Sequence, residues 1–197
     1  MKNRPIPQDH LARILRHSDP DERDLWILAS ETGFRIGDLL KIRQWQVPKC
    51  NSGLPMAADR QGLTEPCRLT LTEEKTGKLR AVELTEKAIT ALQRSLNNCP
   101  TRHPFRYLFP SRLRSGAVDS DGERKGSRHL HRSTAHRHFA RCVRAAGLSD
   151  KGYTVHSLRK VYAQRLYAET RSALAVQRDL GHASLQTTLL YIFALAL

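Results

Sequence analysis

The spacing of apolar residues is the strongest constraint on how this chain folds. Along most of its length they recur three or four positions apart, the repeat of an amphipathic helix. Only two short segments alternate at period two. Helices are therefore predicted at 9–17, from 20 to near 33, around 36–40, after Thr85, and at about 133–146, 156–169, 172–180 and 185–195.

The two alternating segments, 67–72 and 79–84, flank the sequence EEKTGK. A polar connection that contains glycine between two such segments predicts a β-hairpin. Residues 48–66 and 111–131 are rich in Pro, Gly, Ser or Arg and are predicted to be loops. The expected fold class is α+β, one mostly helical domain with a small antiparallel sheet.

Residues before two of the predicted helices have the composition of helix starts. Asp19, Pro20 and Glu22 correspond to an N-cap, a first-turn proline and a capping-box carboxylate. Thr85 is the expected N-cap of a later helix. These signals predict where both helices begin.

The net charge points to a polyanionic partner. Lys and Arg number 33 against 19 Asp and Glu, a formal charge of +14. Seven of the basic residues lie between Arg124 and Arg144, a segment without Asp or Glu, and no nearby carboxylates are expected to balance them. A phosphate-binding surface is therefore favoured over an ordinary solvated helix face. The candidate DNA-binding residues are Arg128, Arg132, Arg137, Arg141 and Arg144.

Neither a metal nor another cofactor is expected. The histidines of the basic segment alternate with arginines, whose charge would repel a cation. Carboxylates lie mostly in predicted loops and caps, which argues against a two-metal phosphodiesterase. The four cysteines form no C-x-x-C pair, so we expect neither a disulfide framework nor a zinc site.

The hydropathy pattern favours a cytoplasmic, nucleoid-associated protein. The longest apolar run, 191–197, is far shorter than the roughly 18 residues of a membrane span. The first residues are polar and include proline, so no signal peptide is expected.

Phosphodiester chemistry without metal needs fixed cations, a nucleophile and proton-transfer groups. His156 and Arg159 share one face at the start of a predicted helix, where free N–H groups favour an anion. His182 lies on a turn after Gly181, and Tyr191 lies nearly two turns into the last helix. The chain thus offers every group that such chemistry requires.

Four motifs together resemble the tyrosine recombinase (phage integrase) family. They are TGFRIGDLL at 32–40, KTGK at 75–78, HSLR at 156–159, and Gly181-His182 followed nine residues later by Tyr191. Each motif is weak alone, but their order and spacing make the resemblance specific, and it covers residues 1–197 as a single catalytic domain. It implies a recombinase fold related to type IB topoisomerases.

The resemblance implies a role for each matching residue. Arg35 and Arg159 would bind non-bridging oxygens of the scissile phosphate. Tyr191 would attack the phosphorus and displace the 5′ oxygen, which leaves a 3′-phosphotyrosine.

Four further residues complete the implied site. His156 would accept the phenol proton, and Lys75 would protonate the leaving oxygen. His182 would donate to the phosphate, and Asp38 would orient the first arginine of the site.

The resemblance also implies partners, namely double-stranded DNA and further copies of the chain bound to it. About ten residues precede the first predicted helix, so the DNA-clamping domain that usually comes first in the family is expected to be absent. Lys160 stands where histidine is common, and the apolar residues 192–197 favour self-association.

The predicted function is that of a site-specific DNA recombinase or integrase that cuts and rejoins strands without metal. Three alternatives remain open at this point. They are a non-catalytic DNA-binding regulator with the same fold, a type IB topoisomerase-like enzyme, and a basic structural or RNA-binding protein.

Overall fold

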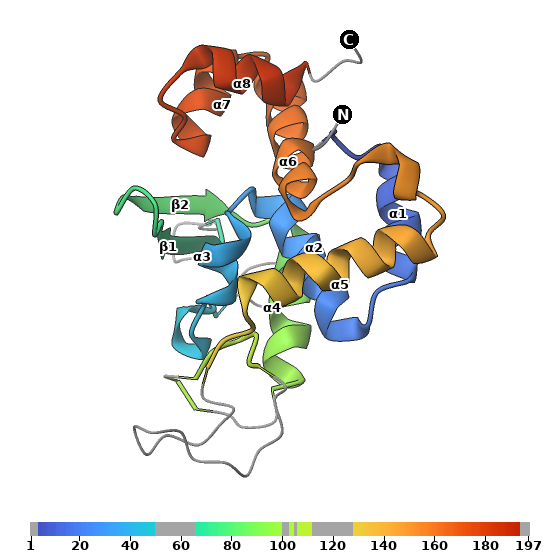
Figure 1. Ribbon diagram of the computed structural model, residues 1–197. Helices are drawn as coiled ribbons and strands as arrows, with labels where there is room; N and C mark the ends of the chain where they lie inside the picture. The colour runs from blue at the N-terminus through green and yellow to red at the C-terminus, as the bar shows by residue number, and fades with distance from the viewer. Residues whose placement is uncertain (1–3, 50–65, 100–102, 105, 112–127, 194–197) are drawn as a thin grey trace.

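The structure is a computed structural model that describes residues 4–49, 66–99, 103–104, 106–111 and 128–193. Helices dominate it, and two antiparallel strands form a small sheet (Figure 1). The helices are α1 (Gln8–Arg16), α2 (Pro20–Thr32), α3 (Ile36–Leu40), α4 (Glu86–Asn97), α5 (Arg132–Ala145), α6 (Val155–Thr170), α7 (Ala173–Leu180) and α8 (Leu185–Ile192). Two 3-10 helices, η1 (Gln44–Gln46) and η2 (Ser149–Lys151), and the strands β1 (Arg68–Thr72) and β2 (Leu79–Glu83) complete the described elements. The predicted fold class is confirmed.

Helix α2 is the centre of the core. It packs against α4 and α6, and its Leu25, Trp26 and Leu28 are fully buried. The Trp26 ring meets Phe139 of α5 edge to face, with centroids 5.1 Å apart. Burial of such large apolar side chains is the main stabilising contribution to a domain of this size.

The β-hairpin lies below the α7–α8 pair in the view of Figure 1. Leu69 pairs with Val82 and Leu71 with Arg80, and these four residues form the buried face of the sheet. The Arg80 guanidinium continues toward α7, where it forms an ion pair of 2.6 Å with Asp179. This partly buried pair fixes the hairpin against the end of α7.

Gly33 ends α2 and turns the chain toward the first basic motif. Its φ of 62° lies in the left-handed region, which glycine adopts without strain. A Cβ at this position would lie 2.3 Å from Cδ1 of Tyr162, so any side chain here would displace the Tyr162 ring. The glycine therefore permits both the turn and the close approach of α6.

The predicted helices and strands agree with the structure to within one or two residues, except that α8 ends at Ile192 and not near residue 195. The two 3-10 helices were not predicted. The predicted loops at 48–66 and 111–131 lie mostly outside the described residues. The Thr85 cap is confirmed, since its Oγ1 accepts a hydrogen bond from the Ala88 amide.

Two local predictions were wrong. Asp19 occupies the N-cap position of α2 but makes no side-chain capping bond. Its carboxylate instead accepts a hydrogen bond from Arg141 of α5. The four cysteines were expected to be thiols, but Cys67 is disulfide-bonded, whereas Cys142 is a free cysteine.

Candidate active site

A cleft of about 580 Å³ opens among α3, the hairpin turn and the first turns of α5 and α6. Most of its polar lining is cationic or can become so. The polar residues that define its chemistry are Arg35, Asp38, Lys75, Arg132, His156 and Arg159. Residues of three of the four motifs, from distant parts of the chain, therefore meet in one concave, positively charged site.

Arg35 enters the cleft from the turn between α2 and α3. It is the N-cap residue of α3, and its backbone carbonyl accepts hydrogen bonds from the amides of Asp38 and Leu39. Its side chain is 27% exposed, and its Nη1 lies 2.7 Å from a carboxylate oxygen of Glu73. The arginine is thus held by one carboxylate while part of it stays open to solvent.

Arg159 lies one turn inside α6 and is 3% exposed. A capping box fixes the start of this helix. The Thr154 side chain accepts a hydrogen bond from the Ser157 backbone N–H, and the Ser157 hydroxyl accepts one from the Thr154 backbone N–H. The guanidinium donates to the carbonyls of Gly33 and Leu180. Burial, followed by repulsion from Arg35, lowers the pKa of Arg159 to about 10, so it stays charged at neutral pH.

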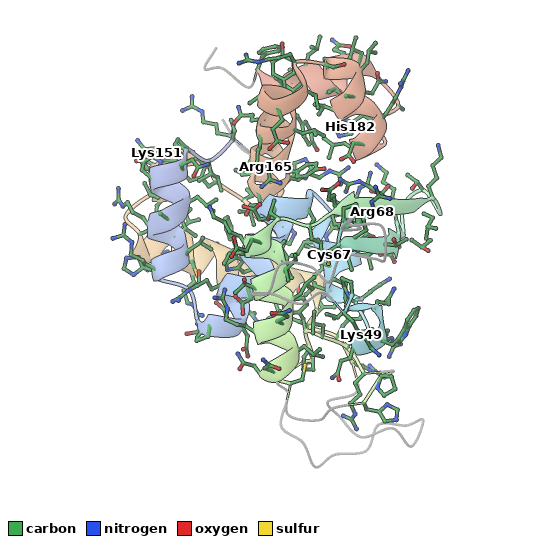
Figure 2. The ribbon with its side chains drawn as sticks, turned by 180° about the vertical axis from the view of Figure 1, so that it is seen from behind. Lys49, Cys67, Arg68, Lys151, Arg165 and His182 are labelled. Carbon is green, nitrogen blue, oxygen red and sulfur yellow. The ribbon has the colours of Figure 1, made fainter. Side chains whose placement is uncertain are left out.

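Tyr191 of α8 lies between two imidazole rings. Its hydroxyl is hydrogen-bonded to Nε2 of His156, and the two rings are nearly perpendicular, at 87°. The ring of His182 approaches from another side, with its centroid 4.5 Å from that of the phenol. Figure 2 shows His182 on the α7–α8 unit, on the side that faces the hairpin carrying Arg68. The phenol is therefore positioned by both histidines of the motifs.

The pKa values of these three groups set their protonation states at neutral pH. Burial raises the pKa of Tyr191, although Arg159 and Arg35 oppose the increase. Burial and then the nearby Arg159 charge lower the pKa of His156 to about 4, although part of its ring stays exposed. The same two causes lower the pKa of His182 to about 4. At neutral pH the phenol is protonated and both imidazoles are neutral, so Nε2 of His156 can act as the acceptor.

Lys75 reaches the cleft from the turn between β1 and β2. It is exposed and lines the same cavity as the two arginines. The turn is closed by hydrogen bonds from the Gly77 amide to the Glu73 carbonyl and from the Glu73 amide to the Lys78 carbonyl. A lysine at this position can approach a bound group while its backbone remains fixed.

The implied role of Asp38 differs from its observed contacts. Its Oδ1 accepts a hydrogen bond from the Glu74 amide at 3.0 Å, which ties α3 to the hairpin turn. Among the contacts of the described residues, the carboxylate paired with Arg35 is Glu73. Among the described contacts the Asp38 carboxylate makes no hydrogen bond or ion pair with the Arg35 guanidinium, so its implied role in orienting that arginine stays a prediction.

Glu73 is a buried charged residue beside the site that the sequence did not single out. It is 2% exposed and lies beside both arginines of the site. A signal for it exists in the strand pattern, because Leu69, Leu71 and position 73 fall on the same buried face of the hairpin. A carboxylate on that face needs a buried cation as partner.

The basic residues of the α5 segment divide into two groups. Arg132 lines the cleft, while Arg137 and Arg144 are exposed farther along the helix. Arg128 lies in the segment before α5 and is also exposed. This distribution leaves basic groups both at the cleft and beside it.

Arg141 departs from the predicted phosphate surface. It forms ion pairs with Asp19 at 3.0 Å and with Glu22 at 3.1 Å. Glu22 also lies 2.7 Å from Nδ1 of His138. The assumption that no carboxylates balance this helix was therefore wrong, because α2 supplies them.

No cluster of three His, Cys, Asp or Glu side chains suitable for a metal ion was found among the described residues. None of the helices in the described ranges is long and apolar enough to cross a membrane.

Comparisons with known proteins agree with the motifs. The chain is 29% identical over 167 residues to the tyrosine recombinase XerD of Brucella suis biovar 1 (strain 1330). This alignment covers 83% of the chain and 45% of the relative, so the chain spans less than half the length of that protein.

Solved structures share the fold. The crystal structure of XerA recombinase matches with a TM-score of 0.69 and 22% identity, over 97% of this chain and 59% of that one. A lambda integrase dimer bound to a COC′ core site matches with a TM-score of 0.63 and 22% identity, over 98% of this chain and 48% of that one.

The family assignment rests on the match to a family model. Residues 4–196 match the Phage integrase family, which is nearly the whole sequence. The four motifs fall within this range, and the resemblance seen in the sequence is confirmed. This chain belongs to the phage integrase family.

Proposed function

We propose that this chain is the catalytic domain of a site-specific DNA recombinase, which cuts and rejoins strands through a 3′-phosphotyrosine intermediate. One observation carries the proposal: the Tyr191 hydroxyl is hydrogen-bonded to a neutral His156 at a cleft lined by Arg35, Lys75 and Arg159. Family membership and the DNA-bound lambda integrase with the same fold support DNA as the substrate.

In the proposed cleavage step, the Tyr191 oxygen forms a bond to phosphorus while the bond from phosphorus to the 5′ oxygen breaks. The phenol proton moves to Nε2 of His156. The leaving oxygen takes a proton from the Lys75 ammonium group. The reaction conserves one phosphodiester-type bond, so another strand's 5′ hydroxyl can reverse it without external energy.

The cations of the cleft would stabilise the pentacoordinate transition state. Arg35 and Arg159 can direct N–H groups at the non-bridging oxygens, whose negative charge grows during attack. Nδ1 of His182 lies 3.0 Å from the Thr188 hydroxyl. With Nδ1 accepting from that hydroxyl, Nε2 carries the ring proton and can donate to the same phosphate.

The capture of DNA tests this function. The purified chain is incubated with a pool of nicked duplexes of randomised sequence, in which the nick lets the cleaved strand diffuse away. Protein-linked DNA is then recovered under denaturing conditions and sequenced. We expect wild type to retain one related group of sequences and Tyr191→Phe to retain none, because phenylalanine has no nucleophile.

A matched variant controls for the loss of an aromatic hydroxyl elsewhere. Tyr167 lies on α6, and its ring contacts Phe193 outside the cleft. Tyr167→Phe should therefore retain the same DNA as wild type. Wild-type protein that captures no DNA from the pool would contradict catalysis and favour a non-catalytic regulator, whereas capture without sequence preference would favour a topoisomerase-like activity.

We also propose that copies of the chain associate on DNA. Apolar side chains lie exposed on the outer part of α7 and α8, and they are Leu174, Leu185, Leu189, Leu190 and Phe193. The lambda integrase with the same fold is a dimer on its core site. When the captured duplex is added, sedimentation velocity should show a complex that contains more than one copy of the chain. A single copy per particle, with and without DNA, would exclude association.

A further inference from the structure

The buried carboxylate of Glu73 lies where the separate motifs of the site meet. Oε2 is 2.7 Å from Nη1 of Arg35 and accepts a hydrogen bond from the Thr76 hydroxyl at 3.0 Å. Oε1 is 3.8 Å from Nη1 of Arg159. A Cβ built on Gly181 would lie 3.7 Å from Oε2, so the carboxylate also approaches the end of α7.

Glu73 lies behind the arginines and does not face the cleft. Of the neighbouring hairpin residues, Glu74 and Lys75 line the cleft, but Glu73 does not. It is 2% exposed, whereas Arg35 keeps 27% of its side chain exposed. A phosphate entering the cleft would therefore meet the guanidinium groups, with the carboxylate on their protein side.

The local charges explain why a carboxylate is needed there. Arg35 and Arg159 repel each other, and this repulsion contributes to the lowered pKa of Arg159. Arg80, the third nearby arginine, pairs with Asp179 at 2.6 Å. Glu73 is the carboxylate that lies within ion-pair distance of both cleft arginines in the described part of the chain. Its own pKa is lowered, because the effects of Arg35, Thr76 and Arg159 together exceed the effect of burial.

We infer that Glu73 is a positioning residue that holds Arg35 beside Arg159 for phosphate binding and fixes the Lys75 turn relative to both. This inference rests on the proposed strand-cleavage function. Glu73 follows the last residue of β1 and precedes Lys75 by two positions, so one side chain connects the hairpin to α3 and α6. It supplies from the hairpin the orienting contact that Asp38 of α3 does not make.

The first test is the rate of cleavage at saturating DNA. Glu73→Gln keeps the size of the side chain and an acceptor for Arg35 but removes the negative charge. The duplex recovered from the capture experiment is cleaved in single-turnover reactions, and its dissociation constant is measured separately. We expect the cleavage rate to fall on the order of 10- to 100-fold, because displaced catalytic groups lose alignment. The dissociation constant should change less than about threefold, since many phosphate contacts share the binding energy.

Glu83→Gln is the matched control, because Glu83 is an exposed carboxylate on β2 of the same hairpin. It should cleave at the wild-type rate. A Glu73→Gln rate equal to wild type would overturn the inference. A faster rate and tighter binding would overturn it too, because a carboxylate that competes with the phosphate would behave in that way.

A second test needs no cleavage and therefore separates this inference from the proposed function. The guanidinium NMR signals of Arg35 are assigned by their loss in Arg35→Lys and compared in DNA-free wild type and Glu73→Gln. We expect hindered rotation of the Arg35 guanidinium in wild type and fast rotation in the variant. Fast rotation in both proteins would overturn the inference, even if wild type cleaves DNA.

Failure of wild type to capture DNA would contradict only the proposed function. Where Glu73→Gln does not fold, Glu73→Asp is used, and its shorter reach should loosen Arg35 in the same manner.

Discussion

Replacement of Arg159 by alanine is expected to abolish strand cleavage and to lower the free energy of unfolding by about 3 to 5 kcal/mol, the usual cost of removing one partner from a buried charged cluster. The side chain is 3% exposed and donates to the carbonyls of Gly33 and Leu180. Alanine would leave both carbonyls without their donor and would leave a cavity. Urea denaturation measures the loss of stability, and capture of DNA measures the loss of cleavage.

Arg159→Lys separates the two effects. Lysine keeps the positive charge beside Glu73, but a single ammonium group cannot reproduce the planar set of donors. We expect this variant to recover part of the stability and little of the cleavage rate. Wild-type stability in Arg159→Ala would contradict the role of this residue in joining the ends of α2 and α7.

Replacement of His156 by alanine is expected to lower the cleavage rate at pH 7 by a factor of about 10² to 10⁴, the usual contribution of a general base. The deficit should shrink as the pH rises. His156 has a pKa lowered to about 4, so the wild-type base is already deprotonated at pH 7 and gains nothing from higher pH. Tyr191 has a raised pKa, so its ionised fraction grows about tenfold per pH unit between pH 7 and 9. Only the cleavage rate of the His156→Ala variant depends on the ionised fraction of Tyr191.

The measurement is the ratio of wild-type to variant single-turnover rates at each pH on the same duplex. Any pH-dependent step that the two proteins share cancels in this ratio. His17→Ala, at the exposed C-terminal end of α1, is the control and should match wild type throughout. A deficit of the same size at pH 7 and pH 9 would contradict the role of His156 as the proton acceptor.

The sequence predicts most of the fold because its elements are determined by local patterns. The apolar face of α2, with Leu25, Trp26 and Leu28, is visible from spacing alone and is fully buried. The hairpin follows from two alternating segments and a turn with glycine. The 3-10 helices η1 and η2 escape such reasoning, because three residues do not show a period.

The positions of the candidate site residues also follow from the motifs, but their contacts do not. Asp38 and Glu73 are both carboxylates near a motif, and the family resemblance implied an orienting role only for Asp38, three residues from Arg35. The structure pairs Arg35 with Glu73, which is 38 positions away in the sequence and is brought close by the fold. Contacts between distant segments depend on packing that a single sequence does not show.

The basic helix illustrates the same limit. Arg141 shares a predicted face with Arg137 and Arg144, and its local sequence has no carboxylate. Asp19 and Glu22 reach it from α2. The two acidic residues have the sequence signature of a helix cap, so their role as partners for α5 could not be predicted from local sequence.

The chemical identity of the covalent bond tests the central claim most directly. Wild-type protein captured on the selected duplex is digested with protease and nuclease, and the modified peptide is sequenced by mass spectrometry. We expect one modified peptide, with a nucleotide joined through its 3′ phosphate to the Tyr191 oxygen. A nucleotide on any other residue, or one joined through a 5′ phosphate, would contradict the proposed arrangement of nucleophile and leaving group.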